Sequence, residues 1–377
     1  GKVAAQFVWG RPSCWANVSA MSMDGLEDDV APARLKPKLE YPLGEPPEPG
    51  VAREIAPGVH WVRMPLPFAL QWINLWLLED GDGWTIVDTG IAMEATREHW
   101  RAIFEAKLGG KPVKRVICTH MHPDHMGLAG WICRKFDATL WMSRLEYITG
   151  RMLVADTGRE APEEGVTFYR AAGWDEDLLD SYRVRFGGFG KAVSKMPDAY
   201  RRMEDGEVID INGRPWRVIT GNGHCPEHVC LWQEDLKLFI SGDQVLPRIS
   251  SNVSVFPTEP DGDPLTDWIN SCKKLLAVMP NDVLVLPAHN EPFHGLHERL
   301  QNLIDGHEKA LDRVLDRIKK EPRRAIDLFG ALFARKIGAD LVGMATGEAI
   351  AHANCLIGRG LARRVVDSEG VARYVST

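Results

Sequence analysis

The stretch Thr119-His120-Met121-His122-Pro123-Asp124-His125 places three imidazoles and one carboxylate within six consecutive residues. It follows directly on Val113 to Cys118, an apolar run typical of a buried strand. A single histidine is more often an ordinary polar residue, but no structural need explains this density. The point where a strand gives way to a loop is also a common location for ligands and catalysts. The stretch therefore predicts a metal site.

The sequence around this stretch alternates between strand and helix patterns. Upstream lie short β-type runs, and downstream lie further strands and helices with turn residues between them. The expected strands cover residues 59–64, 72–78, 84–87, 113–118, 208–211, 216–219, 229–233, 237–241 and 283–286, and the expected helices cover 93–108, 127–136 and 264–279. This alternation predicts an α/β domain with enough strands for two sheets.

Composition and residue pattern divide the chain into three parts. Residues 1–50 end in a Pro-, Gly- and Glu-rich run and are interpreted as an N-terminal extended arm. Residues 51–297 are predicted to form the α/β domain that contains the histidine stretch. Within it, residues 160–197 mix aromatic and charged side chains without a clean period, which indicates a helical insertion or a lid.

Residues 298–377 are predicted to form a small C-terminal domain. A helix over 298–320 would carry one apolar face, formed by Leu300, Leu303, Ile304, His307, Leu311, Val314, Leu315 and Ile318. Helical runs at 325–336 and 346–359 follow, and then two strand runs flank the turn at 367–370. Three helices and a hairpin indicate a winged-helix-like unit.

The histidine stretch resembles the H-x-H-x-D-H signature of the metallo-β-lactamase superfamily. The resemblance covers about residues 55 to 297 and includes four further sites in the family's order. These are Val87-Asp88-Thr89-Gly90, Gly223-His224-Cys225-Pro226-Glu227-His228, Ser241-Gly242-Asp243 and Leu286-Pro287-Ala288-His289. Cys225 stands where the family usually has Ser or Thr, and Glu227 stands where it usually has Gly. Cys225 is interpreted as a packing residue or a support for the ligands.

The resemblance implies an αββα sandwich that holds two divalent metal ions. One ion would be bound by His120, His122 and His224, a second by Asp124, His125 and His289, and Asp243 would bridge them. Asp88 and His228 would support these ligands from outside. Zn²⁺ is the expected metal, because the ligands are nitrogen and oxygen atoms, and iron or manganese are alternatives.

The resemblance also implies hydrolysis, with Asp124 and Asp243 as the catalytic carboxylates. Two metals about 3.5 to 4 Å apart can share a water, lower its pKa to about 7 and polarise a carbonyl. The leading hypothesis is therefore a hydrolase that attacks a thioester, ester or lactone with a metal-bound hydroxide, similar to the glyoxalase II and lactonase branches. A nuclease-like phosphodiesterase acting on RNA is the alternative. Arg248, Asn252 and Trp72 are candidate substrate contacts, with a surface salt bridge as the other interpretation of Arg248.

Charge and composition bear on partners and location. The chain has a formal charge of −7, and its segment from Gly295 has 14 basic and 11 acidic residues, or +3, which leaves −10 for the rest. Such a balance disfavours nucleic acid as a partner. The resemblance implies a small-molecule acyl substrate instead. The C-terminal segment is expected to support the active site or to form a homodimer contact. Seven scattered cysteines, no apolar run of bilayer length and no export signal at the N-terminus predict a cytoplasmic protein without a membrane partner.

Overall fold

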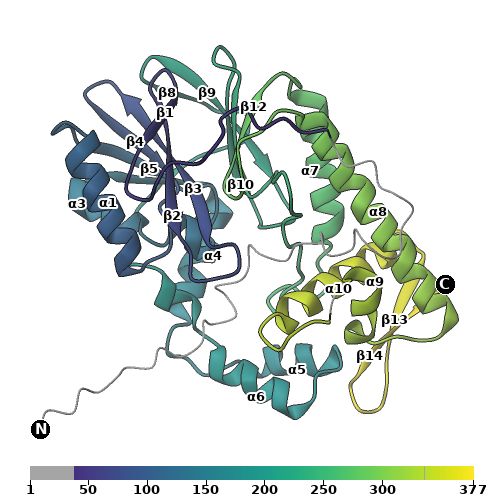
Figure 1. Cartoon of the computed structure of the whole chain (residues 1–377). Helices are drawn as coiled ribbons and strands as arrows, with labels where there is room; N and C mark the ends of the chain where they lie inside the picture. The colour runs from purple at the N-terminus through teal and green to yellow at the C-terminus, as the bar shows by residue number, and fades with distance from the viewer. Residues whose placement is uncertain (1–37, 335) are drawn as a thin grey trace, which may run out of the picture.

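Two β-sheets stack face to face at the centre of the molecule (Figure 1). The computed structural model describes residues 38–334 and 336–377. Apolar side chains from both sheets meet between them, among them Trp61, Trp76, Trp216 and Leu231, which are at most 2% exposed. Burial of both inner faces therefore holds the two sheets together.

The first sheet has seven strands in sequence order. Its strands are β1 (Arg53–Ala56), β2 (Val59–Pro65), β3 (Trp72–Asp80), β4 (Gly83–Val87), β5 (Val113–Ile117), β6 (Thr139–Met142) and β7 (Arg201–Arg202). β1 to β4 are antiparallel, joined by short turns, whereas β4 to β7 run parallel. The parallel strands need crossover connections, which the helices between them provide.

The second sheet has five strands in the order β12, β11, β10, β9, β8. They are β8 (Val208–Ile211), β9 (Arg214–Gly221), β10 (His228–Gln233), β11 (Leu238–Gly242) and β12 (Leu284–Pro287). Only β11 and β12 run parallel, with α7 (Pro264–Val278) as their crossover. The strands match the runs expected from the sequence, extended or shortened by a few residues at their ends.

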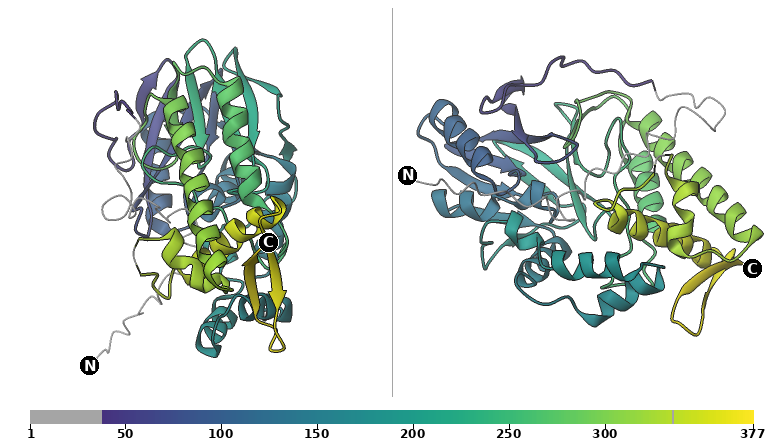
Figure 2. Two further views of the ribbon diagram at one scale, coloured as in Figure 1. Left: turned by 90° about the vertical axis from the view of Figure 1, so that its right-hand side faces the viewer. Right: turned by 60° about the horizontal axis from the view of Figure 1, so that its bottom comes forward.

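Helices cover the outer face of each sheet, which completes the αββα layers (Figure 1). α1 (Glu94–Lys107), α2 (Pro123–Met126) and α3 (Ala129–Phe136) lie on the first sheet, where Trp100 and Ile103 join its outer core. α7 and α8 (Leu296–Lys320) lie side by side on the second sheet (Figure 2, left). The expected α/β sandwich is thereby confirmed.

The segment interpreted as a helical insertion or a lid is largely helical. It contains α5 (Glu163–Ala171), α6 (Glu176–Arg185) and the short 3₁₀ turn η3 (Phe189–Ala192), and it follows α4 (Arg144–Ala155). Tyr169 and Trp174 stack within it with ring centroids 4.3 Å apart. The indole N–H of Trp174 donates to Thr346 of the C-terminal part at 2.9 Å, so this contact joins the insertion to the end of the chain.

The C-terminal part contains three helices and a hairpin. They are α8, α9 (Phe329–Leu332) with the preceding 3₁₀ turn η4 (Ala325–Leu328), α10 (Val342–Gly358), and strands β13 (Ala362–Val366) and β14 (Ala372–Ser376). The helix expected to run to residue 336 ends at Leu332. One apolar core includes α7, α8, α10 and the outer face of the second sheet. Because α8 spans both regions, the C-terminal part is continuous with the sandwich.

The predicted arm falls mainly outside the described residues, which begin at residue 38. Its described end lies against the second sheet, where Glu40 forms an isolated antiparallel bridge with His294. In the described part of the chain, no helix combines the length and the apolar character needed to cross a bilayer.

Candidate metal centre

The predicted ligands lie at the carboxyl ends of the parallel strands of both sheets. The stretch from His120 to His125 follows β5, Asp243 follows β11, and His289 comes two residues after β12. His224 lies in the loop between β9 and β10. Open α/β sheets bind ligands at this edge, because the loops that leave parallel strands converge there.

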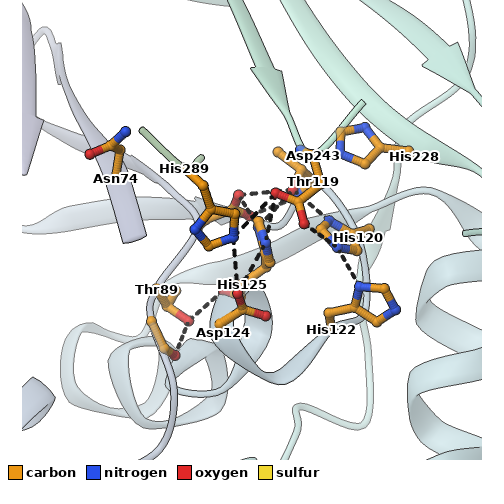
Figure 3. A network of polar contacts seen from close by, with 12 residues as sticks. Asn74, Thr89, Thr119, His120, His122, Asp124, His125, His228, Asp243 and His289 are labelled. Carbon is orange, nitrogen blue, oxygen red and sulfur yellow. Dashed lines mark hydrogen bonds and ion pairs between the residues drawn. The ribbon is translucent and has the colours of Figure 1, made fainter. Parts of the chain in front are cut away.

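The structure brings all seven predicted ligands together, each at most 3% exposed. All of them except His224 are labelled in Figure 3. They form two groups whose nitrogen and oxygen atoms lie within 4.8 Å of one another: His120, His122, His224 and Asp243, and then Asp124, His125 and His289. Asp243 also approaches the second group, because its Oδ1 lies 3.5 Å from Nε2 of both His125 and His289. The two groups contain the residues that the sequence analysis assigned to the two ions, with Asp243 in the first, and their role as metal ligands stays a prediction.

Hydrogen bonds outside the cluster orient three of the imidazoles. Nδ1 of His224 donates to the carbonyl of Asn252 at 2.7 Å, and Nδ1 of His289 donates to the carbonyl of Trp72 at 3.0 Å. Nδ1 of His125 donates to the Asp88 carboxylate at 2.8 Å. A carbonyl or carboxylate only accepts, so each neutral ring carries its hydrogen on Nδ1 and a lone pair on Nε2.

Those lone pairs face carboxylate oxygens instead of donors. Nε2 of His224 lies 3.4 Å from Asp243, and Nε2 of His289 lies 3.3 Å from Asp124. Nε2 of all three rings and both oxygens of Asp243 are buried without a hydrogen-bond partner. Buried acceptors that face each other are costly unless a cation lies between them. This set of imidazole nitrogen and carboxylate oxygen atoms therefore fits divalent metal ions.

The charges of the cluster produce opposite pKa shifts in its two groups. Burial and neighbouring imidazoles hold the pKa of His120 and of His122 well below the ordinary value. Burial also opposes a charge on His125 and His289, but nearby carboxylates outweigh it and raise their pKa. Burial disfavours the anion of Asp124, yet His125 and His289 lower its pKa to about 2. The carboxylates thus attract positive charge, which a proton or a metal ion supplies.

Asp88 supports the histidine stretch from the end of β4. It adopts a left-handed conformation with φ 61°, which costs energy for a residue other than glycine. Its carboxylate accepts the backbone N–H and the hydroxyl of Thr119, each at 2.8 Å, besides the N–H of His125. One buried side chain therefore fixes the start of the stretch and the orientation of one imidazole.

His228 and Cys225 lie beside the cluster with other partners. Nε2 of His228 accepts the backbone N–H of Asp243 at 3.1 Å, so its lone pair is engaged. Burial, with Glu146 next to it, raises the pKa of the Cys225 thiol well above its ordinary value. A neutral buried thiol is a poor ligand, in keeping with the interpretation of Cys225 as a packing or supporting residue.

Two residues that hold the ligand loops escape sequence analysis. Glu146 of α4 is fully buried and accepts the backbone N–H groups of Met121 and Glu227, each at 2.8 Å, so it links two ligand loops. Asn74 of β3 donates to the carbonyls of Pro287 at 2.9 Å and Asn290 at 2.6 Å, on either side of His289. Neither lies in a motif, and only the fold brings them to the site.

The three candidate substrate contacts differ in their surroundings. Arg248 donates to Glu291 at 2.9 and 3.1 Å, with its side chain 50% exposed, which is the salt bridge considered as its other interpretation. Trp72 is partly buried, and Arg63 lies over its ring at 4.3 Å. Asn252 is buried and its amide donates to Glu348 at 2.8 Å. A contact of any of the three with substrate stays a prediction.

Comparison with known proteins agrees with this geometry. Residues 73–289 match the model of the metallo-beta-lactamase superfamily, and residues 311–377 match that of the metallo-beta-lactamase-like C-terminal domain. A crystal structure of a beta-lactamase domain protein from Burkholderia ambifaria is similar, with 41% identity, a TM-score of 0.82, and coverage of 90% of this chain and 98% of the other.

Two relatives of named activity are more distant. The probable metallo-hydrolase YqjP of Bacillus subtilis is 25% identical, over 72% of this chain and 84% of its own length. The human acyl-coenzyme A thioesterase MBLAC2 is 23% identical, over 68% of this chain and 85% of its own length. A family model that matches more than half of the chain, together with the clustered histidines and aspartates, leads to one conclusion: the chain is a hydrolase of the metallo-beta-lactamase superfamily.

Proposed function

We propose that the chain is a dinuclear metal-dependent hydrolase that attacks the carbonyl of a small-molecule thioester, with esters and lactones as related substrates. The observation that carries this proposal is the set of buried Nε2 lone pairs of three imidazoles that lie beside the two oxygens of Asp243, all of them without a hydrogen-bond partner. His120, His122 and His224 would hold one ion, Asp124, His125 and His289 the other, and Asp243 both. Zn²⁺ suits these ligands best.

When bound, the metal ions would supply a water of lowered pKa and polarise the substrate carbonyl. The protein itself orients the imidazole rings and the ligand loops. Asp88, Trp72 and Asn252 fix three imidazole rings through their Nδ1 hydrogens, and Glu146 holds two ligand loops at a constant separation. Hydrolysis adds water across the C–S bond and yields a carboxylic acid and a thiol. Asp124, whose low pKa keeps it ionised, and Asp243 are the carboxylates placed to assist proton movement.

We propose a thioester as the main substrate, and not another acyl compound, because relatives named as thioesterases align over about two thirds of this chain. We therefore propose a reaction type similar to that of the glyoxalase II and lactonase branches. We further propose that the winged-helix-like residues 298–377 belong to the enzyme's framework instead of binding RNA. Several of their arginines already have acidic partners, since Arg323 pairs with Glu321 and Arg324 with Asp327.

The six cysteines in the described part of the chain are all free and buried. They support a reducing, cytoplasmic environment as part of the same proposal. The domain limits after residues 50 and 297 are likewise proposed, with the second placed inside the first turn of α8.

The test is a substrate panel assayed with metal-loaded protein. It should contain acyl-coenzyme A thioesters, lactones, p-nitrophenyl esters, a penicillin and bis-p-nitrophenyl phosphate. We expect thiol release from a thioester to be the fastest reaction and to be lost in Asp124→Asn. Asp137→Asn is the matched control, because Asp137 is exposed and its left-handed backbone suits asparagine. Faster cleavage of the phosphodiester would contradict the proposal and favour the RNA-cleaving alternative.

A further inference from the structure

The loop of residues 244–255, which follows Asp243, is held by the C-terminal helices. Arg299 of α8 donates to the carbonyls of Leu246 at 2.6 Å and Ile249 at 2.8 Å, and His307 of α8 lies 3.3 Å from the Ser250 hydroxyl. From α10, the carbonyl of Gly347 accepts the N–H of Val255 at 3.1 Å. The C-terminal part therefore determines the course of a loop that begins at a predicted ligand.

The approach of α10 to this loop is close. A Cβ atom at Gly347 would lie 2.7 Å from Cβ of Ser254 and 2.8 Å from the carbonyl oxygen of Val255, closer than such atoms pack. The next residue of the helix, Glu348, is only 1% exposed. A carboxyl group is seldom buried in an apolar helix face without a specific partner, so this side chain calls for an explanation.

Glu348 is connected to the metal centre by two hydrogen bonds. Its Oε2 accepts from Nδ2 of Asn252 at 2.8 Å, and the carbonyl of Asn252 accepts the Nδ1 hydrogen of His224 at 2.7 Å. The Ser254 hydroxyl donates to Oδ1 of Asn252 at 2.6 Å, so the amide orientation is fixed. Each group in this path is at most 6% exposed.

We propose that Glu348 is a positioning residue for the metal centre, which acts through Asn252 to keep Nε2 of His224 directed toward Asp243. The inference rests on the proposed metal site and is independent of the substrate. It makes the C-terminal part a component of the site, because Glu348 lies 124 positions beyond His224 in the chain. Groups that orient a ligand from outside commonly change metal affinity by about 10- to 100-fold when they are removed.

The test compares Glu348→Leu, which removes the acceptor, with Glu348→Gln, which keeps an oxygen for Asn252. Thr346→Val is the matched control, because it removes buried hydrogen bonds of the same helix, those with Trp174 and the Val342 carbonyl, and leaves the bond between Glu348 and Asn252 in place. Co²⁺ affinity and the visible spectrum of the Co²⁺ protein are measured well below each unfolding temperature. The tautomer of His224 is read from its ¹⁵N shifts in the metal-free protein.

We expect Glu348→Leu to weaken one Co²⁺ site by about 10-fold or more, to alter the spectrum and to mix the His224 tautomers. Glu348→Gln should restore all three properties, and Thr346→Val should change none. Asn252→Ala cuts the same path from the loop side, and its effect should not add to that of Glu348→Leu. If Glu348→Leu does not fold, Asn252→Ala alone tests whether this hydrogen-bonded path positions His224.

Three results would overturn the inference: unchanged Co²⁺ binding in Glu348→Leu or Asn252→Ala, an equal loss in Thr346→Val, or additive losses in the double variant. A wild-type protein that binds no Co²⁺ would refute the proposed metal centre itself, and the inference with it. That failure is recognised separately, because it is seen before any variant is made.

Discussion

Asp243 is the residue on which the cluster depends most. Its Oδ2 lies 3.4 Å from Nε2 of His224, and its Oδ1 lies 3.5 Å from Nε2 of both His125 and His289. Its carboxylate therefore lies beside imidazoles of both groups of predicted ligands. His228, in contrast, binds the backbone N–H of Asp243 and leaves the carboxylate to the ligands.

We therefore expect Asp243→Ala to reduce kcat by more than about 100-fold with the fold retained, since a bridging ligand is lost. His228→Ala should cost about 10-fold, because it removes a group that acts through Asp243. Steady-state kinetics on metal-loaded protein, with circular dichroism as the control for folding, measure both. An inactive but fully metallated His228→Ala beside an active Asp243→Ala would reverse this ranking.

The raised pKa values of His125 and His289 predict how metal binding depends on pH. Both imidazoles attract a proton in the metal-free protein, because Asp243 and Asp124 favour their charged forms over the opposing effect of burial. A metal ion must displace these protons, so apparent affinity should rise with pH, by up to about tenfold per unit for each proton released. Competition with a chelator at pH 6 to 8 measures this, and an affinity independent of pH would contradict it.

At the same scale, the clustering of the seven candidate ligands could be predicted because they stand in short motifs at strand ends. Glu146 and Asn74 could not, although they hold the same loops. A single glutamate on a helix, or a single asparagine in a strand, has the same local pattern whether it faces solvent or a backbone N–H. Only the packing of α4 and β3 against the ligand loops separates the two cases.

Among the elements, α8 and α10 carry the link between the C-terminal part and the sandwich. The apolar face of α8 was predicted from spacing, and it is buried, as Leu300, Leu311 and Val314 are at most 2% exposed. The short strands β1, β6 and β7 were not predicted, since two to four residues give no measurable period. The burial of Glu348 in α10 could not be predicted from the sequence either. Nearly the whole helix is buried, so its residue pattern does not show which polar side chains lie inside the protein.

Glu348 provides a prediction for α10 itself. Burial raises its pKa from 4.5 to about 8, with the Asn252 hydrogen bond opposing. The folded state therefore holds a proton that the unfolded chain releases, and between pH 4.5 and about 8 a rise in pH destabilises the fold, by up to about 1.4 kcal/mol per unit. Glu348→Gln cannot ionise, so its stability relative to wild type should increase across that window.

Urea unfolding of both proteins at several pH values measures this difference. Other titrating groups cancel in the comparison, and His352, which contacts the same turn of α10, stays neutral in the window because burial lowers its pKa to about 4. A stability difference that is constant from pH 5 to pH 8 would show that Glu348 is ionised in the folded protein.

Across the whole molecule, charge argues against a nucleic acid partner. The chain carries −7, and the basic side chains at the end of α8 and beyond include Arg313, which donates to the Ala331 carbonyl at 2.7 Å, and Arg324, which binds Asp327. We expect no salt-dependent binding of RNA or DNA at physiological ionic strength, as measured by fluorescence anisotropy. Tight binding that weakens steeply with salt would restore the phosphodiesterase alternative.

We expect one chain to hold two metal ions at the carboxyl ends of the parallel strands of its two sheets. Metal analysis after loading with Zn²⁺ and removal of the excess tests it most directly, because one tetrahedral ion uses at most about four protein ligands and seven lie together here. We expect two equivalents of zinc per chain, falling to one when His289 is replaced by alanine. A wild-type protein that saturates at one equivalent would contradict the dinuclear centre.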